Sequence, residues 1–422
     1  MRRVIKIDYL SRIEGESGVY IEITEDSIKV QMRVFEAPRF FESFLKGRPF
    51  QDAIDFTARI CGICPVAYQM SSVHAIEKIF GIDVDKHIRD LRRLMYCAEW
   101  ISSHSLHVYL LHGPDFYGLE SAWASKEYLP ILKKGLFFKR LGDELLTILG
   151  GRSIHPVNVR VGGFYKDPDI KKLKEIVPSL KKAFEDSLKE IKWVSTLKYQ
   201  KDSSEREYVS LRNDNEYPMN YGNVVSSKGL SVKMGDFLNL IEEYQKEYST
   251  ALYSGIKRDE MQPYLVGPIA RLNLNYHHLP QDIKDVIYES GIEIPITDLN
   301  RGIIARVIEI SYAFYESIRL IKSIESIEAL PEQEFEPCSG SAAWITEAPR
   351  GMLIHQYELD DTGRIANCRL TPPTSQNLAM MEEEIKNLVE SNKRMERTKL
   401  TAAVASLIRS FDPCISCSVH LL

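Results

Sequence analysis

Arg59-Ile-Cys61-Gly-Ile-Cys64 and Asp412-Pro-Cys414-Ile-Ser-Cys417 lie near opposite ends of this 422-residue chain. Each contains a C-x-x-C unit, and this spacing lets both sulfurs of a pair point to one centre. Two such pairs can supply four thiolates to a single metal site. Because most of the chain lies between the pairs, a shared site would join the two ends of the chain across the core. The motifs therefore constrain the fold as well as the chemistry.

The spacing alone leaves the kind of site open. Structural zinc sites usually bring their pairs together within about 15–20 residues of chain, which is far less than the separation here. An all-cysteine iron–sulfur cluster also fits the number of ligands. A thioredoxin-like dithiol needs only one pair in a βαβ context, and that context is absent. Thiolates suit nickel, iron and zinc alike, so the residues around the cysteines must identify the metal.

The composition narrows the class of protein. The chain has 54 Lys and Arg against 59 Asp and Glu, a formal net charge of −5, which gives no overall attraction to nucleic acid or to an anionic membrane. No apolar run reaches the roughly 18 residues of a membrane helix, and Asp8 and Arg12 interrupt any signal-like stretch. Seven cysteines are too few for a disulfide scaffold. We therefore expect a cytoplasmic enzyme with no nucleic-acid partner and no membrane span.

Hydrophobic periodicity predicts strands at the N-terminus and helices through much of the rest. Val19, Ile21 and Ile23 alternate with polar residues, as in a half-buried strand. Strands are also predicted at 344–354 and 364–370, around the turn 360–363. Apolar residues recur at helical spacing in residues 59–81, 85–112, 131–150, 168–197, 299–326 and 375–410.

This pattern predicts an α+β fold that is mainly α, with a core of long packed helices and peripheral antiparallel β-sheets. No low-complexity linker divides the chain, and no repeat with a period of roughly 20–50 residues is found. We therefore expect one unit over residues 1–422. Its predicted parts are an N-terminal β region (1–36), a mainly helical body (37–330), a β region (331–374) and a C-terminal helix with the second cysteine motif (375–422).

The two cysteine motifs resemble those of the nickel–iron hydrogenase large subunit. Several further motifs of that family also occur along this chain, in the family's order. Ser11-Arg-Ile-Glu14-Gly15 and Arg39-Phe-Phe-Glu42 resemble its N-terminal motifs, and the second cysteine motif continues to His420. Several separated motifs in the right order are far more specific than one C-x-x-C. The other segments that carry the resemblance are residues 104–107, 112–115, 150–156, 305–309 and 347–351.

The resemblance implies that the four cysteines hold a nickel–iron centre. Cys61 and Cys414 would be terminal nickel ligands, and Cys64 and Cys417 would bridge nickel to an iron that carries one carbon monoxide and two cyanides. Two close metals can polarise a small molecule between them. The implied reaction is reversible heterolytic cleavage of dihydrogen to protons and electrons.

The resemblance also implies a proton route and a catalytic arginine. Cys417 would accept the first proton and Glu14 would relay it, although Glu14 taken alone resembles an ordinary surface carboxylate. Arg350, next to Pro349 at the cofactor, would lie over the open metal position. Its guanidinium stays charged and offers rigid hydrogen-bond donors. Two carboxylates would orient Arg350, namely Asp115 and Asp412.

Glu42 and His420 match ligands of a further buried ion, magnesium or iron. A frayed terminal histidine is the alternative for His420. In this family a protease trims the precursor just after this histidine, and here only Leu421 and Leu422 follow it. Either the sequence is a precursor with a very short tail, or trimming does not occur, and the intact mass of the purified chain distinguishes the two.

Other residues match no ligand position. Tyr68 stands where the family commonly has His; it can donate a hydrogen bond toward a sulfur but does not titrate near neutrality. Cys97, Cys338 and Cys368 are expected to be ordinary thiols. The histidines at 104, 107 and 112 recur on one side of a helix, and we expect them to pack near the site without binding metal.

No cysteines remain for iron–sulfur clusters, and no dinucleotide-binding fingerprint is present. Electrons must therefore leave through another chain, and the resemblance implies a small subunit that holds iron–sulfur clusters. The sequence most resembles the cytosolic NADP-linked hydrogenases, or sulfhydrogenases, which add subunits with FAD and further iron–sulfur clusters. The alternatives are a deazaflavin-reducing or viologen-type relative, a hydrogen sensor, a metal-free structural relative and a four-cysteine structural zinc protein.

Overall fold

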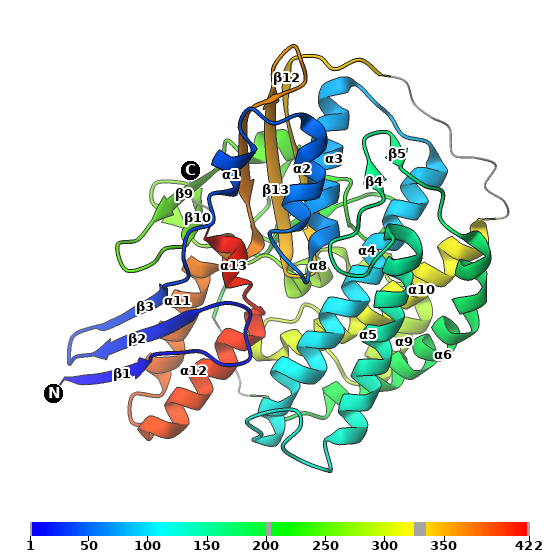
Figure 1. Cartoon of the computed structure of the whole chain (residues 1–422). Coiled ribbons are helices and arrows are strands. Elements are labelled where there is room, and N and C mark those ends of the chain that lie inside the picture. Colours follow the sequence, from blue (N-terminus) through cyan, green and yellow to red (C-terminus); the bar gives the residue numbers. More distant parts are fainter. Residues whose placement is uncertain (1, 200–203, 325–334, 420–422) are drawn as a thin grey trace.

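A computed structural model describes residues 2–199, 204–324 and 335–419. At its core α4 (Lys86–Leu106) contacts both α5 (Leu129–Gly150) and α10 (Gly302–Ser323), and α6 (Ile170–Ser195) packs on α10 (Figure 1). Gly142 permits the close approach of α5 to α4, because a Cβ there would lie 2.6 Å from the carbonyl oxygen of Ala98. The predicted core of long packed helices is confirmed.

Small antiparallel sheets complete the fold, as predicted. They are β1-β2-β3, β6-β7-β8, β11-β10-β9, β12-β13-β14 and the pair β4-β5. The strands are β1 (Arg3–Ile7), β2 (Ser17–Ile23), β3 (Ile28–Val34), β4 (Val159–Arg160), β5 (Gly163–Phe164), β6 (Val209–Arg212), β7 (Asn223–Ser226), β8 (Ser231–Val232), β9 (Ile241–Gln245), β10 (Leu252–Lys257), β11 (Met261–Gln262), β12 (Gly340–Ala348), β13 (Gly351–Leu359) and β14 (Ile365–Thr371). The region expected to be mainly helical thus contributes β4 to β11.

Two predicted elements differ from the structure. Residues 344–354, predicted as one strand, belong to a hairpin of β12 and β13 whose turn contains Pro349 and Arg350. Proline cannot donate to a β-ladder, and Gly351 has a φ of +131° that glycine adopts without strain. Residues 375–410, predicted as one helix, form α11 (Pro373–Ser391) and α12 (Arg397–Phe411).

The N-terminal region and the C-terminal segment meet beside the helical core. The short helix α13 (Ile415–Ser418), red in Figure 1, lies close to the blue N-terminal segments. The N–H of Ile415 donates to the carbonyl of Glu14 at 3.1 Å, and the N–H of Arg39 donates to the carbonyl of Val419 at 2.9 Å. The first cysteine pair lies between α2 (Phe50–Ala58) and α3 (Pro65–Phe80). In the described part of the chain no helix is long and apolar enough to span a membrane.

Candidate metal centre

The structure brings the four motif cysteines together. The sulfurs of Cys61, Cys64, Cys414 and Cys417 are all buried and lie within 4.8 Å of one another. Two thiolates bound to one ion at about 2.3 Å can be as far as roughly 4.6 Å apart, which is close to this spread, so the arrangement suits a metal. Cys414 and Cys417 lie in this cluster with Cys61 and Cys64, and all four must be deprotonated to bind metal as thiolates.

The turn before α3 prepares the first pair for metal binding. Cys61 Sγ accepts hydrogen bonds from the N–H groups of Ile63 and Cys64, both at 3.3 Å. The hydrogen bond from the Cys64 thiol lowers the pKa of Cys61 against the effect of burial, and the charge of Arg350 lowers it further. The two N–H groups and the charge of Arg350 therefore favour the thiolate form of Cys61. Pro65 begins α3 at a position where a helix needs no N–H.

A reversal of the chain after α12 places the second pair. Asp412 ends the helix in the left-handed conformation with a φ of +54°, which Asp tolerates better than most residues. The N–H of Cys414 then donates to Thr374 Oγ1 at 2.9 Å. These contacts fix Cys414 3.6 Å from Cys61, measured between the sulfurs.

Arg350 lies beside the sulfurs with a free donor group. Its Nε donates to the carbonyl of Asp412 at 2.8 Å, and its Nη2 lies 3.2 Å from Asp412 Oδ1. Nη1 is buried and has no hydrogen-bond partner among the described residues. Burial opposes the charge of Arg350, but Asp412 and the thiols of Cys64 and Cys61 outweigh it and raise its pKa. A permanent cation that acts on the thiols of Cys61 and Cys64 thus keeps one N–H group without a partner among the described residues.

The two carboxylates predicted to orient Arg350 have different partners. Asp412 makes the predicted contact. The prediction for Asp115 is wrong, because its carboxylate pairs instead with Arg12 and with Arg409, whose Nε is 2.7 Å away. Asp115 lies in the 3-10 helix Gly113–Tyr117 that follows α4. The family resemblance predicts that this acidic residue is present, but it does not predict which residue its carboxylate pairs with.

Glu14 lies against the second cysteine motif. Its Oε2 accepts from the N–H of Ser416 at 3.1 Å, and its Oε1 accepts from the Ser416 hydroxyl. Gly15, with a φ of +84°, makes this possible, because a Cβ there would lie 2.7 Å from Ile415 Cβ. Glu14 is half-buried and contacts the residue next to Cys417, and its role as a proton relay stays a prediction.

Other predicted residues lie farther from the sulfurs or lack the expected contact. Glu42 is buried in α1 (Phe41–Leu45), where its Oε1 accepts from the N–H of Leu370 at 2.7 Å and burial raises its pKa to about 7. His420 lies outside the described residues. Tyr68 is buried, but its hydroxyl has no hydrogen-bond partner in the described parts of the chain, so the expected bond to a sulfur is not made.

The histidines of the 104–112 segment make no metal cluster with the described cysteines or acids. His104 Nε2 lies 2.9 Å from Glu309 Oε2, and His107 Nε2 donates to the carbonyl of Arg409 at 2.7 Å. These contacts agree with the expected packing role.

Sequence reasoning missed Glu99. This buried residue of α4 accepts from the N–H groups of Val66 and Ala67 at 2.6 and 3.1 Å, so its carboxylate caps the helix that follows Cys64. The only signal in the sequence is an acidic residue next to the apolar stripe of a long helix. Thr374 was missed too, because nothing local links it to Cys414.

Comparison with known proteins identifies the family of this site. The model of the nickel-dependent hydrogenase family matches residues 39–128 and 241–420, more than half of the chain. The chain is 31% identical to sulfhydrogenase 1 subunit alpha of Pyrococcus furiosus, over 99% of this chain and 98% of the relative. It is also 31% identical to sulfhydrogenase 2 subunit alpha of the same organism, over 99% of each chain.

Solved structures show the same fold. An NAD+-reducing nickel–iron hydrogenase in the H2-reduced state has a TM-score of 0.87 at 23% identity, over 99% of each chain. The reduced nickel–iron–selenium hydrogenase of D. vulgaris Hildenborough has a TM-score of 0.80 at 24% identity, over 100% of each chain. Four buried sulfurs at metal-binding distance, with a buried arginine N–H that has no partner among the described residues, suit a nickel–iron centre. The chain belongs to the nickel-dependent hydrogenase family and is the catalytic subunit of a nickel–iron hydrogenase.

Proposed function

We propose that this chain splits dihydrogen in a multi-subunit complex that passes the electrons through an iron–sulfur small subunit to NADP. The observation that carries the proposal is the cluster of four buried sulfurs beside Arg350 Nη1, a donor without a partner among the described residues. A buried donor needs an acceptor, and an anionic ligand on a metal at the sulfurs would supply one.

The residues suit an iron that carries one carbon monoxide and two cyanides. We assign Cys61 and Cys414 as terminal nickel ligands and Cys64 and Cys417 as bridges to the iron. When bound, this group supplies the polarising metal pair for heterolytic cleavage of dihydrogen. Arg350 would donate Nη1–H to a cyanide nitrogen, a charge-assisted bond stronger than a neutral one. Its neighbour Pro349 would line the cofactor.

The proton would leave through Cys417 and Glu14. Both oxygens of Glu14 accept from Ser416, the neighbour of Cys417, which holds the carboxylate at the second cysteine motif. A carboxylate that both takes up and releases a proton can act as a relay.

We propose that Glu42, with His420, binds a further magnesium or iron ion. Glu42 is a buried carboxylate, and buried charges in proteins are paired or coordinate metals. Glu42→Gln should remove one ion per chain in elemental analysis and leave the nickel content unchanged. An unchanged total metal content would refute the assignment.

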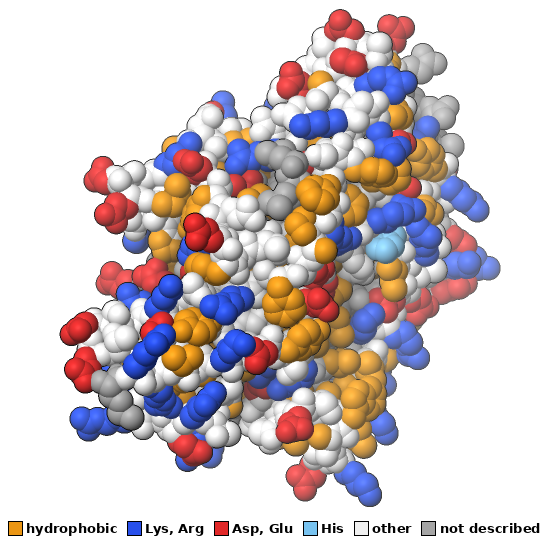
Figure 2. Space-filling model, turned by 60° about the vertical axis from the view of Figure 1, so that its left-hand side comes forward, with side chains coloured by type: hydrophobic (Ala, Val, Ile, Leu, Met, Phe, Trp, Pro, Cys, Tyr) orange, Lys and Arg blue, Asp and Glu red, His pale blue; other side chains and the backbone are white. Residues whose placement is uncertain are grey.

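Electrons would leave through partner subunits. Of the other cysteines, Cys97 and Cys368 are buried and Cys338 is exposed, and no group of three or more metal-binding side chains that includes them occurs in the described residues. The face in Figure 2 shows hydrophobic patches among the charged side chains. Such patches mark protein interfaces. We infer an iron–sulfur small subunit, and further iron–sulfur and FAD subunits that reduce NADP, and sulfur as a second acceptor, at other sites of the complex.

The acceptor is tested on the purified native complex. Under dihydrogen it should reduce NADP, followed by the absorbance of NADPH. Reduction of a deazaflavin or a viologen dye but not of NADP would favour those relatives, and binding of dihydrogen without turnover would favour a sensor. We place the complex in the cytoplasm, where reducing conditions keep cysteines as thiols; recovery of activity from the periplasmic fraction would contradict this.

Cys64→Ser is expected to abolish binding of nickel and iron, because three sulfurs remain and a serine oxygen is a poor substitute for a soft thiolate. Nickel and iron per chain are measured on the purified complex. Cys338→Ser is the matched control, since Cys338 is exposed, and it should retain both metals. Normal metal content in Cys64→Ser would refute the ligand assignment.

A further inference from the structure

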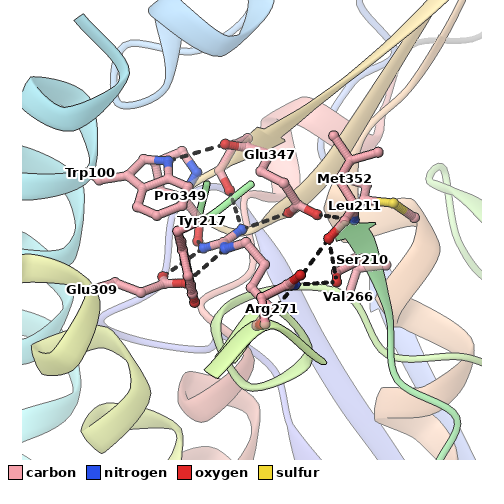
Figure 3. A network of polar contacts seen from close by, with 12 residues as sticks. Trp100, Ser210, Leu211, Tyr217, Val266, Arg271, Glu309, Glu347, Pro349 and Met352 are labelled. Carbon is pink, nitrogen blue, oxygen red and sulfur yellow. Dashed lines mark hydrogen bonds and ion pairs between the residues drawn. The ribbon is translucent and has the colours of Figure 1, made fainter. Parts of the chain in front are cut away.

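A fully buried ionic network lies next to the turn that carries Arg350 (Figure 3). Its centre is Arg271, in α8 (Pro268–Asn275). Nε and Nη2 of Arg271 donate to the two carboxylate oxygens of Glu309, both at 2.8 Å, and Nη1 donates to Glu347 Oε2 at 2.9 Å. The side chains of all three residues have no exposed surface. The network therefore joins α8, α10 and β12 inside the molecule.

The same guanidinium binds the backbone of the turn. Arg271 Nη1 donates to the carbonyl of Ala348 at 2.7 Å, and Nη2 donates to the carbonyl of Pro349 at 2.9 Å. Trp100 Nε1 donates to the carbonyl of Glu347 at 3.1 Å, and its ring lies 4.4 Å from the Arg271 guanidinium carbon. Three successive carbonyls before Arg350 are thus each bound by a side chain. Buried carbonyls require partners, and here the partners come from one cluster.

The start of α8 also touches the turn directly. Gly267 has a φ of +115°, and a Cβ there would lie 2.8 Å from the carbonyl oxygen of Arg350. Gly351 has a φ of +131°, and a Cβ there would lie 2.5 Å from Val266 Cγ2. Two glycines therefore let the helix that carries Arg271 press against the turn that carries Arg350.

The network holds two carboxyl groups on one guanidinium, and the two respond differently: burial raises the pKa of Glu347. Burial would raise the pKa of Glu309, but the charge of Arg271 and hydrogen bonds from Arg271 and His104 lower it to about 2. Tyr217 also donates to Glu309 Oε1, at 2.9 Å, and the N–H of Leu211 donates to Glu347 at 2.8 Å. Buried ion pairs add little net stability relative to apolar packing. Their value lies in a fixed geometry.

We propose that Arg271 is a positioning residue for the hydrogenase reaction. By holding the carbonyls of Ala348 and Pro349, it fixes the turn so that Arg350 keeps its place beside the four sulfurs. Catalytic groups must be held within about 0.5 Å of their productive geometry by the residues around them. The inference rests on the role proposed above for Arg350, and Arg271 itself touches none of the sulfurs in the described contacts.

The test is Arg271→Lys in the purified native complex. Lysine keeps the charge but loses the planar fork that reaches both carbonyls. We expect nickel and iron to remain bound, the cyanide stretching bands to shift, and the turnover of dihydrogen to fall by about 10²-fold, as for a misplacement of about 1 Å. In an Arg350→Lys background the same change should have almost no further effect on turnover, because coupled residues are not additive.

Arg92→Lys is the matched control. Arg92 is equally buried and forms a two-pronged pair with Glu77 at 2.8 and 2.7 Å, but it binds no carbonyl of the turn. It should lower thermal stability without moving the cyanide bands. Trp100→Phe is a milder second variant that keeps an aromatic ring but removes the hydrogen bond to the Glu347 carbonyl. It should shift the same bands and lower turnover by about tenfold, the effect of one hydrogen bond of about 1.4 kcal/mol.

Wild-type cyanide bands and turnover in Arg271→Lys would overturn the proposal. The proposal would also be overturned if the double variant lost turnover by the full product of the single losses in Arg271→Lys and Arg350→Lys. If Arg271→Lys does not assemble, unchanged bands in Trp100→Phe would overturn it. A wild-type complex without cyanide bands would instead refute the proposed function. The spectrum of the wild-type complex reveals this before any variant is made.

Discussion

Replacement of Arg350 by lysine is expected to lower the turnover of dihydrogen by about 10²–10³-fold, the usual effect of removing one preorganised donor from an active site. Arginine holds Asp412 with two nitrogen atoms and still leaves Nη1 without a partner among the described residues. A lysine ammonium is a single point of charge on a flexible stem, so it cannot satisfy Asp412 and also occupy the position of Nη1. Dihydrogen oxidation with an artificial electron acceptor measures the effect.

The metal content should not change in this variant, because Arg350 is not a metal ligand in this account. Arg319→Lys provides the control, since Arg319 is half exposed and pairs with Glu316 on α10. Its turnover should equal that of the wild type. Near wild-type turnover in Arg350→Lys would refute the assigned role of Arg350.

Glu14→Gln is expected to lower the exchange of dihydrogen with solvent deuterons by about 10²–10⁴-fold, the usual contribution of a positioned acid–base group. Glutamine has the same shape and can still accept a hydrogen bond from Ser416 Oγ, so the site should keep its structure. An amide, however, cannot take up and release a proton near neutral pH. Mass spectrometry of the gas over deuterium oxide measures the exchange.

Glu16→Gln is the control for this experiment, because Glu16 is an exposed carboxylate two residues away. It should exchange at the wild-type rate. The infrared bands of the metal ligands should be unchanged in both variants. A Glu14→Gln complex that exchanges normally would remove Glu14 from the proton route.

The cysteine motifs allowed the centre of the fold to be predicted. Four thiolates on one ion require that Cys61 and Cys414 meet, and the structure places their sulfurs 3.6 Å apart. The long helices were also predicted, since α4, α5, α6 and α10 each carry a sustained apolar stripe. An apolar stripe within one helix and a set of cysteines that bind one metal can both be recognised in the sequence.

Contacts between distant segments leave no such signal. The turn at Arg350 lies between two strands that periodicity alone reads as one, because apolar residues continue on both sides of Pro349. The sequence shows that Asp115 is acidic, but its pairing with Arg12 and Arg409 depends on how the last turn after α4 faces α12. The bonds from Arg271 to the turn likewise join residues that only the tertiary fold brings together.

Infrared spectroscopy of the native complex shows whether the four cysteines hold a nickel–iron centre. The four cysteines should hold an iron with one carbon monoxide and two cyanides, so the spectrum should contain one carbon monoxide band and two cyanide bands. All three should disappear in Cys64→Ser. An active wild-type preparation that lacks these bands and contains zinc in place of nickel and iron would contradict the account.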